Sequence, residues 1–483
     1  MMASAASEVA QPGRARVYPR SVDGRFRRLK SAILVLAYTV YFGLPWLRWD
    51  RVVAADQAVL FDIDARNYYI FDLVIHVQDF FLLAGFLMIA AFLLFFVTGV
   101  AGRVFCGYFC FQTLWTDVFM WLERRIQGER PARMRLDRAP WSLSKVWKKG
   151  LTHLSWLAVA FATGFTFTLY WGNAPELAAG FFNGQAHSAM YATTLVLMAT
   201  TYTMAGIARE QVCTYMCPYA RFQSAMFDSD TLIIAYDRDR GEGPQGRAKV
   251  AKGLKTRAER QQAGVGDCID CGYCVQVCPT GIDIRDGLQL QCISCGLCVD
   301  ACDTIMDSMG WPRGLVRYSS ENALAGKRTR YLKPKSVGYA LVVAVLVGVC
   351  IAYAANRAPL ELVVNQVRQP LSVTLSSGWI QNSYEVKVSN MTQQPVTVDL
   401  GIQGLPESRL ALGDFQTLSL APEQSLEVLA KVQVPPSEAR PGQLSFSFTA
   451  EFVTAGAAAD AESAAEPMGP RGTMVQRAAF YTP

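Results

Sequence analysis

The chain has 483 residues, of which 51% are hydrophobic, so it is long enough for more than one domain. Long apolar runs alternate with basic stretches, and the formal net charge of +6 is concentrated beside those runs, which favours a membrane-topology signal over nucleic-acid binding. The three histidines and the lack of a C-x-x-C-H motif argue against a c-type haem or several bis-histidine haems.

The first part of the chain is predicted to be a polytopic helical membrane domain. Residues 1–30 form a basic, Arg-rich N-terminus that we expect to be disordered. Residues 31–208 hold apolar stretches about as long as the hydrocarbon core is thick. Residues 48–79 are predicted to be a folded interfacial loop, and residues 102–150 a basic loop. The four predicted spans in this region are residues 31–47, 80–101, 151–171 and 188–208.

The next part is polar and basic, and a fifth predicted span follows it. Residues 209–336 contain most of the cysteines, and residues 337–355 are again apolar. Lys and Arg beside span ends mark cytoplasmic loops. We therefore expect residues 1–30, 102–150 and 209–336 to be cytoplasmic, which leaves residues 356–483 outside the cell membrane.

The C-terminal segment alternates apolar and polar residues in short stretches separated by turn residues. This pattern predicts an antiparallel, immunoglobulin-like β-sandwich. The Ala-rich residues 455–471 are expected to form a flexible loop before a last strand at 473–481. The other predicted strands are residues 371–376, 383–390, 395–402, 425–434 and 444–453.

Two C-x₃-C pairs directly follow the second and fourth predicted spans. Cys106 and Cys110 lie in GRVFCGYFCFQTLWTD, and Cys213 and Cys217 lie in REQVCTYMCPYARFQ. On a helix, residues four apart project from one face. If the two spans pack together, four thiols converge at the cytoplasmic membrane boundary. Soft thiolates select Cu(I), zinc or iron–sulfur centres; the alternative is that these small cysteines only pack helices.

Residues 268–302 hold eight of the thirteen cysteines in two copies of one motif. The first C-x₂-C-x₂-C-x₃-C copy is followed by Pro279, whereas Asp303 stands at that place in the second. In bacterial proteins with this spacing, the fourth Cys of each copy ligates the other of two clusters. We therefore predict two [4Fe–4S] clusters in a ferredoxin-like α+β module of about residues 258–318. Cluster 1 is assigned to Cys268, Cys271, Cys274 and Cys302, and cluster 2 to Cys292, Cys295, Cys298 and Cys278.

Zinc and disulfide bonds are the plainer alternatives for these eight cysteines. Zinc sites usually pair two C-x₂-C units across a longer spacer. Disulfides need an oxidising compartment, and the predicted topology places this region in the reducing cytosol. The spacing therefore favours iron–sulfur clusters.

Two further residues could bind metal but have plainer roles. His153 starts the third predicted span and is a weak candidate to supplement the four thiols, although a histidine at a helix end more often makes interfacial hydrogen bonds. Cys350 stands alone within the fifth predicted span, where a cysteine usually packs like a small apolar residue.

Taken together, these motifs resemble the cytochrome c oxidase accessory proteins, the CcoG, FixG or RdxA family. The resemblance covers most of the chain, and Asp303 is the residue that this family usually carries after the second motif. The stretches that carry it are GRVFCGYFCFQTLWTDVFMWLER (102–124), REQVCTYMCPYARFQSAMFDSDTLI (209–233), GDCIDCGYCVQVCPTGIDIRDGLQ (266–289) and CISCGLCVDACDTIMDSMGWPRGLVRY (292–318).

The resemblance implies a bacterial inner-membrane protein with a cytoplasmic N-terminus, cytoplasmic clusters and a periplasmic C-terminal domain. It implies a cupric reductase that converts Cu(II) to Cu(I) for copper insertion during assembly of the cbb(3)-type oxidase. By position, Cys106, Cys110, Cys213 and Cys217 would be the copper-handling thiols. The implied partners are copper ions, oxidase assembly factors or copper chaperones, membrane lipid and an unidentified cytosolic electron donor. Phe111 departs from the family's usual Pro after the first pair, which leaves the geometry of that pair open.

Two other functions fit the same motifs. One is a quinol-linked membrane electron carrier that feeds a periplasmic reductase. The other is a non-catalytic assembly scaffold whose clusters only sense redox state. The oligomeric state is open, a homo-oligomer included, and so is whether the C-x₃-C pairs bind copper or cycle as disulfides.

Overall fold

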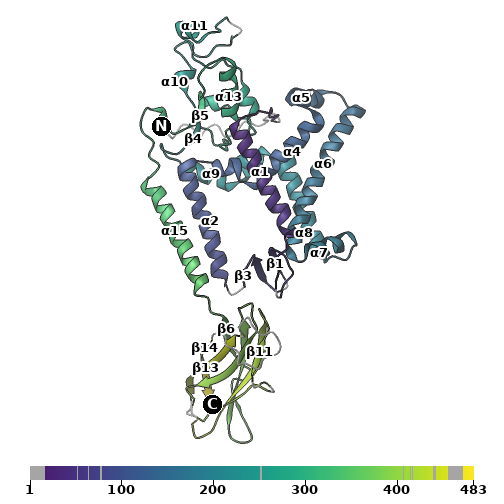
Figure 1. Cartoon of the computed structure of the whole chain (residues 1–483), viewed down its shortest axis with the longest axis vertical. Coiled ribbons are helices and arrows are strands. Elements are labelled where there is room, and N and C mark those ends of the chain that lie inside the picture. The colour runs from purple at the N-terminus through teal and green to yellow at the C-terminus, as the bar shows by residue number, and fades with distance from the viewer. Residues whose placement is uncertain are drawn as a thin grey trace, which may run out of the picture. The chain divides into compact units, whose positions relative to one another are not determined.

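The structure, a computed structural model, describes residues 17–482 except 52, 64, 77–78, 251–252, 406, 414, 416, 439–441 and 455–470. The chain forms two compact units (Figure 1). One extends to Ile351 and contains the long helices and all thirteen cysteines. The other begins at Ala352, includes the short segment Asp50–Ala55, and contains the C-terminal strands.

Among the described residues, four helices are long and apolar enough to cross a membrane. They include α1 (Arg25–Gly43), α2 (Phe80–Ala101), α6 (Leu143–Thr168) and α15 (Pro334–Ala355), and they correspond to four of the five predicted spans. The predicted span 188–208 is helical but changes type. There α8 (Ser188–Thr201) is followed by a π-helix, Tyr202–Ala208, so this segment is not one regular α-helix. The count of five spans remains a prediction.

Shorter elements connect the long helices. The predicted interfacial loop folds into a three-stranded antiparallel sheet. A series of short helices follows α2 in the predicted basic loop, and another precedes α8. The elements are β1 (Val59–Asp62), β2 (Asn67–Ile70), β3 (Leu73–Ile75), α3 (Val104–Tyr108), α4 (Phe111–Gln127), α5 (Arg130–Arg138) and α7 (Ala174–Phe182).

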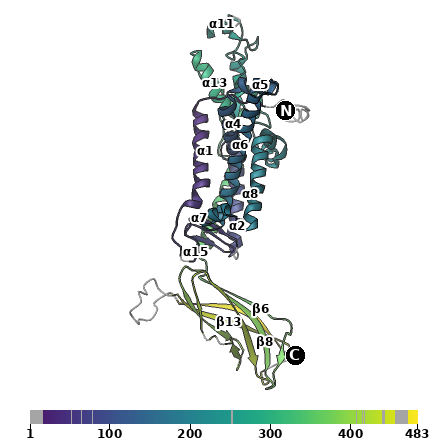
Figure 2. The ribbon, with the colours of Figure 1, turned by 90° about the vertical axis from the view of Figure 1, so that its right-hand side faces the viewer.

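Two groups of helices pack by apolar contacts. Phe119 on α4 stacks on Trp156 of α6, and the Trp156 indole N–H donates a hydrogen bond of 3.0 Å to the Phe119 carbonyl oxygen. Helices α2 and α15 lie side by side in Figure 1, and the Tyr339 ring of α15 contacts the Phe92 and Phe95 rings of α2. Figure 2 shows the long helices α1 and α6 running in nearly the same direction. The Cys350 Sγ atom on α15 lies only 2.5 Å from where a Cβ on Gly85 of α2 would be placed. This close contact agrees with the packing role expected for Cys350.

The eight motif cysteines lie in an α+β module that an antiparallel strand pair closes. Strand β4 (Ile233–Tyr236) pairs with β5 (Val316–Ser319), so the two ends of the module meet and the cysteine motifs lie between them in the chain. Each motif leads into a helix, α12 (Tyr273–Val277) or α13 (Leu297–Ser308). The remaining helices near the module are α9 (Pro218–Ala225), α10 (Arg238–Gly241), α11 (Arg257–Gln262) and α14 (Glu321–Leu324).

Residues 17–28, which we term the N-terminal strap, pack against both cysteine motifs. The Val17 side chain occupies the space that a side chain on Gly281 would need. The Phe26 side chain likewise occupies the space that a side chain on Gly296 would need. Both glycines have positive φ, so the loops need glycine there for their backbone as well as for this contact. The prediction of a disordered N-terminus is therefore wrong for the strap, which is ordered by tertiary contacts; the residues before it lie outside the described part.

The side chain of Asp300, which belongs to α13, caps the N-terminus of α1. Its carboxylate accepts hydrogen bonds from the backbone N–H groups of Phe26 (3.2 Å) and Arg27 (2.7 Å), at the start of α1, whose own N-cap Gly24 has no side chain. A helix start with a carboxylate cap is stabilised by these bonds and by the helix dipole. The contact therefore ties the cysteine module to the first apolar helix.

We expect Asp300→Ala to loosen this connection at a cost of about 1–2 kcal/mol, the usual range for losing a helix cap. Trypsin should then cleave faster after Arg20 and Arg25 in the strap, as measured by mass spectrometry of the products. Asp307→Ala on the exposed end of α13 is the control, because Asp307 pairs only with Arg313 near the surface. Equal cleavage of the two variants would contradict the capping role.

The second unit is a β-sandwich, as predicted. One antiparallel sheet has the order β10-β12-β8-β6, with β7 added to β8, and the other has the order β11-β9-β13-β14. Val386, Val432, Val398 and Phe448, two from each sheet, are fully buried between them. The sequence did not predict β6, β10 or β11. The strands are β6 (Leu360–Gln366), β7 (Val373–Thr374), β8 (Ile380–Asn390), β9 (Val396–Gln403), β10 (Arg409–Ala411), β11 (Leu418–Leu420), β12 (Ser425–Val434), β13 (Gly442–Thr454) and β14 (Arg471–Thr482).

Candidate functional site

The two cysteine motifs have the same local backbone. In each motif the residue before the second Cys and the glycine after it have positive φ: Asp270 (51°) and Gly272 (66°) in the first, Ser294 (51°) and Gly296 (76°) in the second. Such turns cost a non-glycine residue strain, which proteins retain mainly at functional sites. The repeated left-handed turns wrap the first three thiols of each motif around one point.

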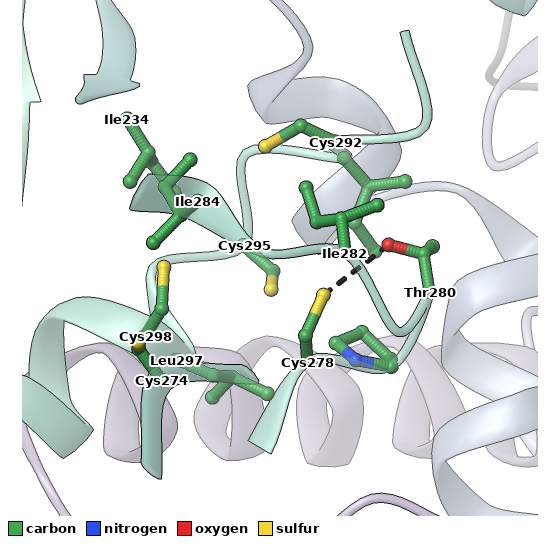
Figure 3. A pocket seen from close by; sticks show the side chains of 12 residues that line it. Ile234, Cys274, Cys278, Thr280, Ile282, Ile284, Cys292, Cys295, Leu297 and Cys298 are labelled. Atoms are coloured by element: carbon green, nitrogen blue, oxygen red, sulfur yellow. Dashed lines mark hydrogen bonds between the residues drawn. The ribbon is translucent and has the colours of Figure 1, made fainter. Parts of the chain in front are cut away.

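One pocket is lined by the four cysteines assigned to cluster 2 (Figure 3). The Sγ atoms of Cys278, Cys292, Cys295 and Cys298 point into a common space, and the pocket contains about 350 Å³ not filled by atoms. Thr280 is the polar side chain among the other lining residues, and its hydroxyl lies 3.3 Å from the Cys278 Sγ atom. The apolar part of the lining is Ile234, Pro279, Ile282, Ile284, Ile293 and Leu297.

A second pocket is lined by the four cysteines assigned to cluster 1. Cys268, Cys271, Cys274 and Cys302 border about 380 Å³ of unfilled space. Cys274 also lines the first pocket, so the two pockets are neighbours. Each predicted set of four lines one pocket, and Cys274 lines both, so which cysteines bind which cluster remains a prediction.

The pockets fit iron–sulfur clusters by their chemistry. Burial, together with the neighbouring thiols, raises the pKa of Cys292 and of Cys302 to about 12. Four thiolates would therefore be unstable in either pocket without a cation to compensate their charge. Iron bound through sulfur supplies that compensation, and most of the other lining residues are apolar. The residues present thus suit two [4Fe–4S] groups, although the ligand assignment itself remains a proposal.

The helices into which the two motifs lead differ in length, and the residues Pro279 and Asp303 account for the difference. Helix α12 has five residues and ends before Cys278 and Pro279, whereas α13 has twelve and continues through Cys302. Proline removes a backbone N–H and clashes with the preceding turn, so Asp at the corresponding place lets α13 extend. The Asp303 carboxylate also accepts a hydrogen bond of 3.0 Å from the backbone N–H of Gly314.

Asp303→Pro should restore the usual ferredoxin residue but destabilise this protein. We expect a cost of about 3 kcal/mol, because the proline would stand inside α13, and a lower midpoint of thermal unfolding in detergent. Asp303→Ala, which loses the contacts of the carboxylate with Gly314 and Arg25 but leaves the helix backbone intact, serves as the control and should cost less. If the proline variant were as stable as the alanine variant, the extension of α13 would not matter to the fold.

The C-x₃-C pairs do not lie on one face of a regular helix, so that expectation is wrong. Cys106 is inside α3, but the helix ends at Tyr108 and Cys110 is the N-cap of α4. Cys213 is inside a π-helix, Val212–Met216, and Cys217 is the N-cap of α9. Each pair therefore spans a break between two helices, with the second Cys at the start of the next one.

Phe111 does not remove this break. It occupies the first position of α4 just as Pro218 occupies the first position of α9, and the preceding Cys110 and Cys217 are both extended, with ψ of 125° and 111°. Proline is favoured at that position because its N–H would be unpaired there anyway, but other residues fit as well. The two pairs thus share an extended second Cys at the start of a helix, despite the sequence departure.

The four thiols are close enough to influence one another. Burial raises the pKa of Cys213 to about 12, and the thiols of Cys110, Cys106 and Cys217 add to the shift. Cys106 is buried, whereas the other three are partly exposed. Its Sγ atom donates a hydrogen bond of 3.2 Å to Oε1 of Gln223 on α9, which links the first pair to the helix that follows the second. The two pairs therefore lie near one another, and that the four thiols form one site remains a prediction.

Backbone contact joins the first C-x₃-C pair to the cluster-2 loop. A Cβ on Gly107 would lie 2.7 Å from the Ile293 carbonyl oxygen and 2.9 Å from the Cys295 Cα atom. The Tyr108 hydroxyl donates a hydrogen bond of 2.9 Å to the Cys295 carbonyl oxygen. Cys106 and Cys295 also belong to one apolar cluster of buried residues. The thiol pair and the cluster-2 ligands are thus in the same packed layer.

His153 has a different environment from the thiols. Its Nδ1 atom lies 2.9 Å from the Tyr202 hydroxyl, and its ring packs edge-on against Trp156. In the part of the chain that the structure describes, no three His, Cys, Asp or Glu side chains are arranged to hold a single metal ion. This holds for the four thiols as well, so copper binding there is a proposal. His153 is left out of that proposal because its Nδ1 atom already contacts the Tyr202 hydroxyl.

Sequence reasoning missed the residues that connect the two sites. Gly107 carried one available signal, because a glycine inside a helix-forming stretch often marks close backbone approach. Arg103 and Gln223 carried no signal in the sequence, because their hydrogen bonds form only where α3, α9 and the cluster-2 loop meet. The same holds for the N-terminal strap.

Family models match three parts of the chain and define its class. Residues 208–321 match a 4Fe-4S dicluster domain, residues 83–128 match a 4Fe-4S binding domain, and residues 350–466 match the IG-like fold at the C-terminus of FixG. The second match includes Cys106 and Cys110. Together with the apolar helices, these domains define a membrane iron–sulfur protein with an immunoglobulin-like C-terminal domain.

The chain belongs to the FixG and RdxA family. It is 39% identical to the nitrogen fixation protein FixG of Rhizobium meliloti, with 91% of this chain and 90% of that protein covered. It is 40% identical to the protein RdxA of Cereibacter sphaeroides, with 82% and 84% covered. A solved structure, that of a FixG-related protein from Vibrio parahaemolyticus, is 19% identical, covers 26% of this chain and 96% of that chain, and gives a TM-score of 0.19.

Proposed function

We propose that this protein reduces Cu(II) to Cu(I) at Cys106, Cys110, Cys213 and Cys217, in the service of assembly of a cbb(3)-type oxidase. The Cu(I) product would pass to oxidase assembly factors or copper chaperones. One observation carries the proposal: the C-x₃-C layer packs directly on the cluster-2 loop, through Gly107 against Ile293 and Cys295. Membership of the FixG and RdxA family supports it, because the family resemblance is what points to copper.

The solvent exposure of the motif cysteines supports a direction for electron transfer. Of the eight motif cysteines, Cys271 of the cluster-1 set is exposed, whereas the cluster-2 set is buried or partly buried. Bound [4Fe–4S] groups would supply one-electron carriers at these two places. A soluble donor can thus approach the cluster-1 side, while the cluster-2 side faces Cys106. We take the donor to be cytosolic, with the N-terminus and the clusters on the cytoplasmic side and the β-sandwich in the periplasm.

The thiols supply the chemistry that favours reduction. Cu(II) prefers nitrogen and oxygen ligands in tetragonal geometry, and thiolates favour Cu(I). Cys110 and Cys217 both stand at helix N-termini and are partly exposed, so a copper ion could reach them. Because burial raises the pKa of Cys106 and of Cys213, these thiols would release protons as they bind copper. A bound iron–sulfur group would supply the one electron that each Cu(II) needs to become Cu(I).

Metal analysis and two activity assays separate this function from its alternatives. Purified protein, chemically reduced under anaerobic conditions, should reduce Cu(II) and should contain the iron of two [4Fe–4S] clusters. Quinol oxidation without copper reduction would support the quinol-linked carrier instead. If the protein showed neither activity, the redox-sensing scaffold would be the remaining hypothesis. Iron beyond two clusters would place a third cluster, rather than copper, at the four thiols, as the 4Fe-4S match over residues 83–128 allows.

A further inference from the structure

Arg103 is a buried cation between the cluster-2 loop and the C-x₃-C layer. It directly precedes α3, and only 3% of its surface is exposed. Its Nε atom donates a hydrogen bond of 3.2 Å to Oε1 of Gln223, the same oxygen that accepts from the Cys106 thiol. Its Nη1 atom donates to the carbonyl oxygen of Leu290, two residues before Cys292. One side chain therefore contacts both redox layers.

The charge of Arg103 has no carboxylate partner among the ion pairs of the described residues. The other buried cation near cluster 2, Lys30, lies 3.8 Å from the Asp117 carboxylate. An unpaired buried charge costs free energy unless nearby anionic groups compensate it. Besides the two oxygens to which it donates hydrogen bonds, Arg103 has three cysteine thiols near it. Burial raises the pKa of Cys106, of Cys213 and of Cys292, and the Arg103 charge lowers all three.

We propose that Arg103 is a positioning residue for electron transfer, which orients Gln223 against Cys106 and stabilises added negative charge on the cluster-2 ligands. This inference rests on the proposed function, because it assumes that electrons pass between these layers. A fixed positive charge in a low-dielectric site favours the more reduced, more negative state. Charge and hydrogen bonds around the sulfur ligands are among the factors that set iron–sulfur potentials.

Two variants separate the charge of Arg103 from its geometry. Arg103→Gln removes the charge, and Arg103→Lys keeps it but loses the planar fork that reaches Gln223 and Leu290 at once. Arg133→Gln is the matched control: Arg133 is equally buried, but it pairs with Glu123, which Arg209 also contacts at 2.9 Å. All three variants keep every cysteine.

The experiment is a redox titration of the purified full-length variants, followed by EPR spectroscopy. We expect Arg103→Gln to lower the midpoint potential of one of the two clusters by about 59 mV, which is tenfold in a one-electron equilibrium constant. Arg103→Lys should restore most of that potential, and Arg133→Gln should leave both potentials unchanged. Unchanged potentials in Arg103→Gln, or the same shift in Arg133→Gln, would overturn the proposal. The titration contains no copper, so a failure of copper reduction in the unaltered protein is a separate result.

Discussion

Replacing Cys213 and Cys217 together with serine is expected to abolish Cu(II) reduction while the visible absorption of the iron–sulfur clusters stays unchanged. The two residues belong to the four-thiol site and lie outside both cluster pockets. Serine oxygens would not stabilise Cu(I) as thiolates do, so the driving force for reduction falls. The rate of Cu(I) formation by the chemically reduced variant is the measurement.

Cys350→Ser is the matched control for this variant. Cys350 packs against Gly85 between two apolar helices, away from the proposed path, so its loss should leave copper reduction intact. Undiminished reduction in the double variant would place the copper site elsewhere. Loss of activity in both variants would indicate a general effect of removing cysteines.

The second large effect is expected at Gly107. Gly107→Ala would place a Cβ 2.7 Å from a backbone oxygen and 2.9 Å from a backbone carbon of the cluster-2 loop, so the α3 backbone and that loop must separate. Overpacking of this kind costs about 1–3 kcal/mol. Since misplacing reacting groups by about 1 Å can cost on the order of 100-fold in rate, Cu(II) reduction should slow by up to that factor. Cluster content, measured as iron per chain, should change little.

Gly150→Ala provides the same substitution where there is space. Gly150 lies in α6, and no heavy atom lies within 4 Å of the position that its Cβ would take. Alanine also has the higher helix propensity, so this variant should be as stable as the parent or slightly more so. A Gly107→Ala protein as active as Gly150→Ala would show that the close backbone contact is not part of the electron path.

Motif spacing and strand alternation were sufficient to predict the features that neighbouring residues in the chain determine. The spacing of the eight motif cysteines indicated a 4Fe-4S dicluster domain, which the family model over residues 208–321 confirms. Strict alternation predicted β12 as residues 425–434, to the residue. The short strands β10 and β11 have three residues each and were missed, because three residues show too little alternation to identify a strand.

The predictions were wrong where tertiary contacts override local signals. The Arg-rich strap resembles a disordered tail by composition, but Val17 and Phe26 fill spaces over two glycines of the cysteine loops. The helix breaks inside the C-x₃-C pairs also escaped prediction. Phe111 does not signal a break as proline does, although Cys110 has an extended backbone in the structure.

The most direct measurement is the reoxidation of chemically reduced protein by Cu(II), followed anaerobically after the reductant has been removed. We expect one Cu(I) for each cluster reoxidised, with both processes at the same rate, and neither process in the variant that lacks Cys106, Cys110, Cys213 and Cys217. Clusters that stay reduced in the presence of Cu(II), or copper reduction that persists without the four thiols, would contradict it.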